Sequence, residues 1–181
     1  GGKPPADGVW TSRVTALARN SDDQVDFVHD DRYFVAPALT WKPDEANELT
    51  VLARYQKADT KAGAGFLPAA GTLLPNPNGR ISPSLYTGEP NANDYVKTLK
   101  SLGYEFRHDF GGGVEFNQSA RLMDSEVEPS ITVGTFGLLP DQRTLSRYLW
   151  STREDEKTFG LDNNLQWKFS TGRAEHTLLA G

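Results

Sequence analysis

The stretch Thr158-Phe-Gly-Leu-Asp-Asn-Asn-Leu-Gln-Trp-Lys-Phe169 alternates apolar and polar side chains, and this alternation decides the fold. Because successive side chains of a strand point to opposite sides, the stretch predicts a β-strand with one apolar face. The apolar side is broken only by Asn163 and carries Phe159, Leu161, Leu165, Trp167 and Phe169. The polar side carries Thr158, Gly160, Asp162, Asn164, Gln166 and Lys168.

The same two-residue period recurs along the rest of the chain, and helical spacing is weak nearly everywhere. Residues 143–169 are predicted to form one long strand, because Ser151–Lys157 contains no Gly or Pro to turn it. The pattern predicts an all-β chain of about six to seven strands in an antiparallel up-and-down meander. The other predicted strands are Val9–Arg19, Arg32–Lys42, Leu49–Lys57, Leu102–Arg107, Val114–Leu122 and a last one from His176 to Gly181.

The predicted connections alternate strictly between short and long ones. In a meander, this order places all short turns at one end of the sheet and all long loops at the other. Bacterial outer-membrane barrels have this asymmetry, with short periplasmic turns and longer extracellular loops. The short connections are Pro43–Asn47, Asp109–Gly113 and Ser170–Glu175, and the long ones are Asn20–Asp31, Asp59–Val96 and Asp124–Gln142.

The aromatic positions agree with a membrane barrel. Tyr33 and Trp41 lie eight residues apart on one face, and Phe159 and Trp167 repeat this spacing. At about 3.3 Å per residue and a tilt near 40°, the spacing covers roughly 20 Å, close to the roughly 25 Å apolar band of such barrels. Pro37 in mid-strand is a feature against this interpretation, because proline cannot donate to a strand ladder. A soluble β-sandwich remains the alternative.

Composition excludes several other classes of protein. The chain has 181 residues, a net charge of -5 and no cysteine, which argues against nucleic-acid binding and excludes disulfides and thiolate zinc sites. Its histidines, His29, His108 and His176, are scattered without the spacing of metal ligands. Carboxylate pairs such as Asp22-Asp23 lie near strand ends, where solvated charge is the rule. We therefore expect no enzyme, no catalytic residue and no metal site.

Several collinear segments are similar to the TonB-dependent siderophore receptors, in particular to the ferrichrome receptor type. The similarity runs through essentially the whole chain in order. It is carried by "APALTWKPDEANELTVLARYQ" at Ala36–Gln56, "GFLPAAGTLLPNPNGR" at Gly65–Arg80, "LGYEFRHDF" at Leu102–Phe110 and "TFGLDNNLQWKFSTGRAEHTLLAG" at Thr158–Gly181.

This resemblance implies a 22-stranded barrel in the bacterial outer membrane, surrounded by outer-membrane lipid and filled by an amino-terminal plug. Such receptors import ferric siderophores with energy relayed by the TonB–ExbB–ExbD system, so iron enters only inside its ligand and no cofactor is expected. Residues 1–181 resemble part of the barrel domain alone, without plug or TonB box. We therefore expect a fragment of a longer receptor, unable to transport by itself.

The resemblance also implies ligand-binding residues in the extracellular loops. The motif of the type Tyr-Gly-Trp-Leu-Pro reads Ala64-Gly-Phe-Leu-Pro68 here, so Phe66 keeps an aromatic ring while Ala64 has lost one. Phe136 is the only aromatic residue near the second expected position, and Tyr86 is a weaker candidate. Phe66, Phe136 and Tyr86 are thus predicted to contact a siderophore, with a ferrichrome or other hydroxamate favoured. A porin-like barrel and a soluble secreted β-sandwich that binds a ligand remain alternatives.

Overall fold

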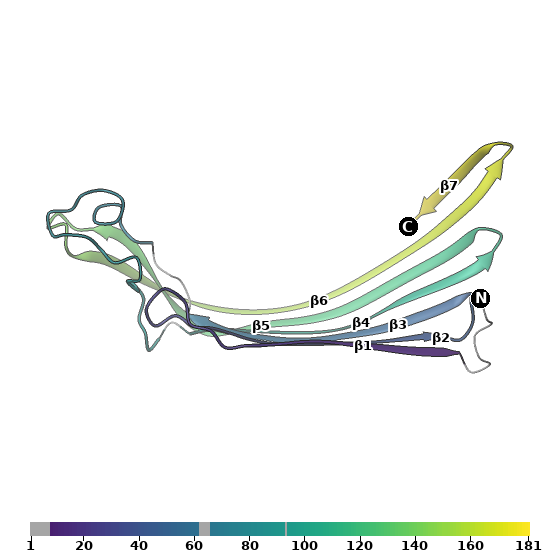
Figure 1. Cartoon of the computed structure of the whole chain (residues 1–181), viewed down its shortest axis with the longest axis horizontal. Coiled ribbons are helices and arrows are strands. Elements are labelled where there is room, and N and C mark those ends of the chain that lie inside the picture. The colour runs from purple at the N-terminus through teal and green to yellow at the C-terminus, as the bar shows by residue number, and fades with distance from the viewer. Residues whose placement is uncertain (1–7, 62–65, 93) are drawn as a thin grey trace.

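The computed structural model of the chain describes residues 8–61, 66–92 and 94–181. Its strands form one antiparallel sheet of seven strands, each paired with its neighbours in the chain, in the order β1-β2-β3-β4-β5-β6-β7 (Figure 1). The predicted all-β meander is therefore confirmed. The strands are β1 (Val9–Arg19), β2 (Asp30–Lys42), β3 (Asn47–Lys61), β4 (Asp94–Gly111), β5 (Val114–Leu138), β6 (Leu145–Thr171) and β7 (Ala174–Ala180).

The strand register gathers the apolar side chains of neighbouring strands on one side of the sheet, which we call the apolar face. Leu49 lies opposite both Trp41 and Phe106, and Leu122 lies opposite both Leu102 and Phe159. Arg13, Thr50, Glu105, Ser119 and Asp162 lie on the opposite side, which we call the polar face. The alternation seen in single strands thus continues across the whole sheet.

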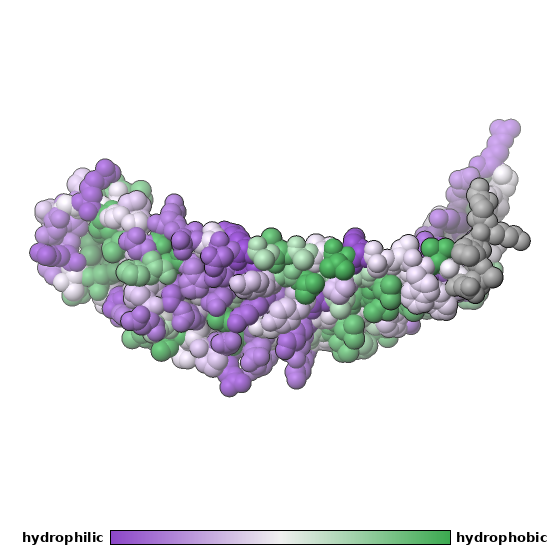
Figure 2. Space-filling view, turned by 60° about the horizontal axis from the view of Figure 1, so that its bottom comes forward, coloured by the Kyte–Doolittle hydropathy of each residue, from purple (hydrophilic) through white to green (hydrophobic). Residues whose placement is uncertain are grey.

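The apolar face is not covered by other described parts of the chain. Large apolar side chains along it are exposed, among them Trp10 at 59%, Leu161 at 53% and Phe159 at 64%. Figure 2 shows part of this green apolar surface open over the strands. The buried apolar side chains, Tyr86, Val96, Val127 and Val133, belong to the rim loop and to parts of β4 and β5 away from the short turns. Since extended apolar patches mark interaction or membrane surfaces, this face fits contact with lipid.

Aromatic rings mark both ends of the apolar band. Trp10 and Trp41 stack near the short turns, with ring centroids 5.7 Å apart and planes at 19°. Tyr33 lies on the same face of β2, toward the other end. Phe159 and Trp167 repeat this arrangement in β6. The predicted eight-residue spacing of aromatic residues on one face is confirmed.

Pro37 interrupts only one of its two ladders. β2 and β3 are paired from Asp30 to Val35 and again from Ala38 to Trp41, with a gap at Ala36 and Pro37. On the other side, the β1 ladder continues through the pair of Val14 and Pro37. The strand tolerates the missing N–H because the pairs on either side of the gap keep one register.

The short turns and the longer connections separate as predicted, with one correction. Residues 43–46, 112–113 and 172–173 form the short turns, and residues 20–29, 66–92 and 139–144 lie at the other end, here called the loop end (Figure 1). The prediction of a long loop at Asp124–Gln142 is wrong, because β5 continues to Leu138. Register shifts between Val127 and Ser130 and between Thr135 and Gly137 accommodate Pro129 and Gly137 in the strand.

A further sequence prediction concerns β6. Residues 145–171 form a single strand, so the prediction of one long strand in this region is confirmed. In the part of the chain that the structure describes, no helix has the length and apolar composition needed to cross a membrane.

The exposed apolar face generates a stability prediction. Leu161→Arg places a charge near the middle of the apolar band and should lower the free energy of unfolding in lipid vesicles by about 2–4 kcal/mol. Gln166→Arg, on the polar face of the same strand, is the matched control and should change stability little. Urea titration of the vesicle-inserted receptor measures both. Equal effects of the two variants would contradict the assignment of the faces.

Candidate functional site

The loop of residues 66–92, here called the rim loop, is hydrogen-bonded to the β5–β6 hairpin. Thr135 Oγ1 donates to the carbonyl oxygen of Phe66 at 2.9 Å. Asn76 Nδ2 donates to the carbonyl of Gln142 at 2.9 Å, and Asn78 Nδ2 donates to that of Asp141 at 3.1 Å. These bonds connect residues more than 60 positions apart in sequence and place the rim loop against the end of β5 and β6.

Arg147 of β6 forms a second connection to the rim loop. Its Nη1 donates to the carbonyl oxygens of Thr87 at 3.1 Å and Gly88 at 3.2 Å. Its Nη2 pairs with Glu89 Oε1 at 2.6 Å. Because the planar guanidinium presents several donors in a fixed geometry, one side chain orients three consecutive residues of the loop.

The other side of the rim loop contacts the β1–β2 connection. The backbone N–H of Asp26 donates to the carbonyl of Ser84 at 2.9 Å. The rings of Phe27 and Tyr86 lie 6.4 Å apart, tilted by 55°. The rim loop is therefore held between two other connections of the loop end.

The β5–β6 turn is organised by the Asp141 carboxylate. It accepts hydrogen bonds from Thr144 Oγ1 at 2.6 Å, from the Thr144 backbone N–H at 3.0 Å and from the Arg143 backbone N–H at 3.0 Å. These donors stabilise the charged form and lower the pKa of Asp141 to about 2, with the Thr144 hydroxyl as the largest cause.

Three aromatic side chains form a cluster where β5 meets β6 at the loop end. The ring of Phe136 lies 4.4 Å from that of Tyr148, and Tyr148 lies 5.2 Å from Trp150. Gly134 faces Tyr148 in the register, and a Cβ at this glycine would collide with the tyrosine ring. Phe136, Tyr148 and Trp150 are all exposed, at 75%, 37% and 44%. We call these three residues the aromatic cluster.

The structure places two of the three predicted ligand residues close together. Phe66 is 88% exposed, and its carbonyl is bound by Thr135, the neighbour of Phe136 in β5. Phe136 belongs to the aromatic cluster. Ala64, the position that has lost an aromatic ring, lies outside the described residues. Contact of Phe66 and Phe136 with a ligand stays a prediction.

Tyr86 has a different environment from the other two candidates. Its side chain packs near Phe27 and is only 8% exposed. Burial, together with the nearby charges of Asp94 and Glu89, raises the pKa of the Tyr86 hydroxyl above its usual value. In the described arrangement, the buried Tyr86 ring joins the rim loop to Phe27 of the β1–β2 connection, and its contact with a ligand stays a prediction.

Sequence reasoning did not identify Tyr148 and Trp150. Both lie in the predicted long strand, two residues apart and therefore on one side of it. The only sequence signal for them was that two aromatic residues, Tyr148 and Trp150, alternate with Arg147 and Leu149. This signal indicates a cluster only if β5 extends to Phe136, because Phe136 then lies beside Tyr148. The sequence analysis had assigned Phe136 to a loop.

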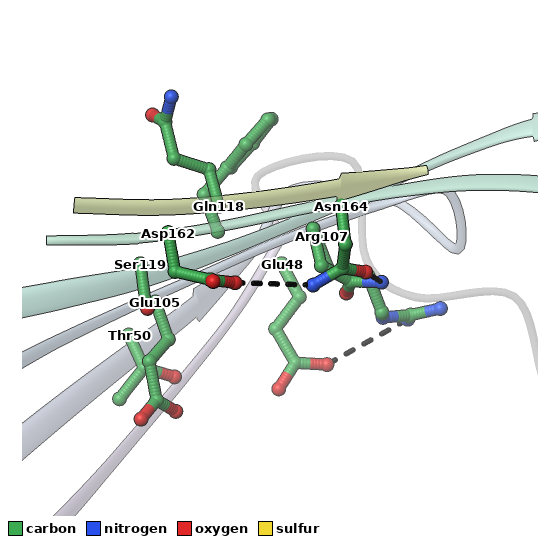
Figure 3. A pocket seen from close by; sticks show the side chains of 10 residues that line it. Glu48, Thr50, Glu105, Arg107, Gln118, Ser119, Asp162 and Asn164 are labelled. Carbon is green, nitrogen blue, oxygen red and sulfur yellow. Dashed lines mark hydrogen bonds and ion pairs between the residues drawn. The ribbon is translucent and has the colours of Figure 1, made fainter. Parts of the chain in front are cut away.

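A separate polar cavity of about 350 Å³ lies on the polar face toward the short turns (Figure 3). Arg107 Nη1 lies 3.3 Å from Glu115 Oε2, and its Nη2 lies 3.7 Å from Glu48 Oε2. Asn164 Nδ2 donates to Asp162 Oδ1 at 3.4 Å. In Figure 3, Gln118 points away from these groups, toward the other side of the sheet. Arg107 thus lies between two carboxylates.

The described residues show no grouping of three or more His, Asp or Glu side chains that could hold a metal ion. Each histidine instead lies beside one polar neighbour. His29 is 3.2 Å from Asp59, His108 is 2.7 Å from Asn47, and His176 is 2.6 Å from Thr171. The expectation that iron enters only within its ligand stays a prediction.

Comparison with known proteins identifies similar sequences. No protein-family model matches the chain. It is 31% identical to the ferrichrome outer membrane transporter/phage receptor of Escherichia coli (strain K12) over 97% of the chain and 26% of that protein. It is 30% identical to the ferrioxamine receptor of Yersinia enterocolitica over 95% of the chain and 24% of that protein. The chain thus spans about a quarter of the length of these curated relatives.

Solved structures show the same fold. The open form of the ferric-catecholate import receptor Fiu from E. coli K12 superimposes with a TM-score of 0.80 and 19% identity, over 93% of this chain and 28% of that chain. The ferripyoverdine receptor of the outer membrane of Pseudomonas aeruginosa gives 0.78 and 18%, over 94% and 22%.

The open meander with one apolar face defines the chain as part of an outer-membrane β-barrel receptor. It belongs to the TonB-dependent siderophore receptor family, as the sequence resemblance predicted. These relatives are named as a transporter and as a receptor rather than as enzymes, which agrees with the expectation of a protein without catalysis.

The contacts of Arg147 predict a change in loop order. Arg147→Ala removes the donors to Thr87 and Gly88 and one partner of Glu89, so the rim loop should open more often. Limited trypsin digestion of the folded receptor should then cleave after Arg80 several-fold faster. Arg143→Ala, which removes an arginine of the same hairpin, is the control and should leave this rate unchanged. Equal rates for all three proteins would contradict the assigned role of Arg147.

The hydrogen bonds of Asp141 predict a pH dependence. Because the pKa of Asp141 is lowered, its stabilisation of the turn is present above the ordinary value of about 3.9. The stabilisation is lost as the pH falls through about 2. Thr144→Val removes the hydroxyl donor and should raise this pKa toward its ordinary value, which a carbon-13 carboxyl NMR titration measures. An unchanged midpoint would exclude the hydroxyl as the main cause.

Proposed function

We propose that this chain forms one wall of an outer-membrane barrel that binds and imports ferric siderophores of the hydroxamate type, such as ferrichrome. The observation that carries the proposal is the exposed aromatic cluster at the loop end, with the rim loop bound to Thr135 and Arg147, the chain neighbours of Phe136 and Tyr148. Similarity to a ferrichrome transporter and to a ferrioxamine receptor supports the same ligand class. Phe66, Phe136, Tyr148 and Trp150 are the proposed contact residues, and Tyr86 supports the loop.

The chemistry of the cluster suits an uncharged ligand with a partly apolar shell. Aromatic rings offer large contact areas with few rotatable bonds, and the Tyr148 hydroxyl and the Trp150 N–H can donate hydrogen bonds. The adjacent cation, Arg147, already binds Glu89 and two backbone carbonyls. A ferric trishydroxamate is uncharged, whereas a ferric triscatecholate is multiply anionic and would call for free cations.

The whole barrel and its partners are part of the proposal. One edge of β1 and one edge of β7 have no partner strand in the described sheet. Unpaired backbone groups are unfavourable in lipid, so we assign further receptor strands to these edges. Energy for import comes, in this proposal, from the TonB–ExbB–ExbD system acting through a plug segment, as in the family.

The two alternatives from the sequence fit less well. A β-sandwich needs a second sheet packed on the first, and the described residues form a single sheet whose apolar face is open. A passive porin would not need an aromatic cluster with a loop bound to it. Membership of the siderophore receptor family argues in the same direction.

Truncation of the aromatic cluster tests the proposal. Phe136→Ala and Tyr148→Ala should each weaken the binding of ferrichrome by about tenfold or more, because losing an aromatic anchor costs on the order of 2 kcal/mol. Phe110→Ala is the control, since Phe110 is also an exposed aromatic residue, at 64%, but lies at the short-turn end. Tryptophan fluorescence quenching of the purified receptor measures affinity.

Growth experiments test the substrate class in the same receptor. A strain that lacks its own receptors and carries the complete gene should grow under iron limitation with a ferric hydroxamate. Growth with a ferric catecholate alone would overturn the hydroxamate assignment but keep the transport function. Growth with neither would overturn the proposed import of these siderophores.

A further inference from the structure

Gly134 lies inside β5, at a position where the backbone does not require glycine. Its φ angle is outside the left-handed region, in contrast to that of Gly137 in the same strand, which is +113°. A glycine inside a strand weakens the strand, because it has no side chain to pack, and it often marks the close approach of another group. The structural reason for Gly134 therefore lies in the space beside it.

The ring of Tyr148 fills the space beside Gly134. The two residues are register partners across the β5–β6 ladder. A Cβ on Gly134 would lie 2.5 Å from the Tyr148 Oη, 2.7 Å from its Cε1 and closest of all to its Cζ. Its three nearest atoms thus all belong to this ring, and Gly134 is buried although it has no side chain. The tyrosine lies across the glycine with its hydroxyl end over the backbone of β5.

Tyr148 is the middle ring of the aromatic cluster. Its centroid lies 4.4 Å from that of Phe136 and 5.2 Å from that of Trp150. Phe136 has no register partner, because the ladder passes from Thr135 to Gly137 in a bulge, and bulges redirect side chains. Within the described residues, the ring contacts of Phe136 and Trp150 are both with Tyr148. The three rings therefore form one surface only while Tyr148 lies across Gly134.

The hydroxyl of Tyr148 is placed by the same contact. It makes no hydrogen bond within residues 8–61, 66–92 and 94–181, so no described group competes with a ligand for it. A tyrosine in this position offers a ligand a ring surface together with an O–H donor. The carbonyl oxygens of a hydroxamate siderophore can accept that hydrogen bond.

We infer that Gly134 is a positioning residue of the siderophore site. Because it lacks a Cβ, Tyr148 can lie across β5 and join Phe136 and Trp150 into one aromatic surface. The inference rests on the proposed function, in which this surface contacts a ferric siderophore. Three consecutive residues of β5 then have separate roles. Gly134 accommodates the tyrosine, Thr135 binds the carbonyl of Phe66, and Phe136 supplies a ring.

A substitution at Gly134 separates positioning from folding. The atoms that a new Cβ would meet form the free end of a side chain, not backbone. In Gly134→Ala, Tyr148 turns to another staggered rotamer and leaves its two ring neighbours, while the β5–β6 ladder stays paired. The variant should therefore resist unfolding in hot detergent as well as the parent does.

Ferrichrome titrations of the purified full-length receptor test the inference in a double-mutant cycle. G134A should bind ferrichrome about three- to tenfold more weakly than the parent, since Tyr148 loses its contacts with two rings. Y148A should also bind more weakly, and G134A/Y148A should bind like Y148A, because Gly134 acts only through that ring. G160A is the matched control and should bind like the parent. Gly160 lies in β6 without a left-handed φ, and a Cβ there would meet no atom within 4 Å.

Near-ultraviolet circular dichroism of the ligand-free receptor reports the position of the ring independently of any siderophore. G134A should change the aromatic signal of the parent, whereas adding G134A to Y148A should change nothing. An unchanged signal in G134A would overturn the inference, and so would a further loss of affinity when G134A is added to Y148A.

The affinities also distinguish failure of the inference from failure of the proposed function. Weak ferrichrome binding by Y148A with parent-like binding by G134A would overturn the inference and leave the proposed function standing. Parent-like binding by both variants, with the dichroism change of G134A present, would contradict the proposed siderophore contact and only through it the inference.

Discussion

Backbone hydrogen bonding between neighbouring strands is the constraint on which the rest of this structure depends. In hydrocarbon an unpaired N–H or C=O costs several kcal/mol, so a strand that faces lipid must be paired along its length. The β5–β6 ladder runs from Val114 to Leu138 with only two register shifts. A slip of one residue would turn Glu105 or Asp162 toward lipid, because side chains alternate between the faces. Charges on the polar face therefore fix the register as firmly as apolar side chains do.

The sequence was most informative where lipid lies on one side of the sheet and polar groups on the other. The bounds of β1 were predicted as Val9–Arg19, and this is where the strand begins and ends. Alternation fails in the outer half of β5, where Val127, Ser130 and Val133 are all buried. There the strand is covered by other parts of the chain, so small polar and apolar residues mix. In the sequence, Pro129 and Gly137 look like turn residues, but in the structure both lie at β-bulges within β5.

In the candidate site too, local sequence patterns did not predict the contacts between residues far apart in the chain. Phe66 and Phe136 were found through family resemblance, and no periodicity indicated that Thr135 would bind the carbonyl of Phe66. Tyr148 could be recognised as part of the site only once the structure placed Phe136 of β5 beside it. The burial of Tyr86 depends on Phe27, which is 59 positions away in sequence. Such contacts are set by packing of separate loops, which a single sequence does not specify.

The rim loop is held less firmly than the strands below it. Its connections to β5 and β6 are side-chain hydrogen bonds at exposed or half-buried positions, each worth about 0.5–1.5 kcal/mol. The strands below are instead held by continuous ladders. Loop opening is therefore a local event with a much smaller free energy than unfolding of the sheet. Opening of the rim loop, and with it movement of Tyr86, therefore leaves intact the register that positions Phe136 and Tyr148.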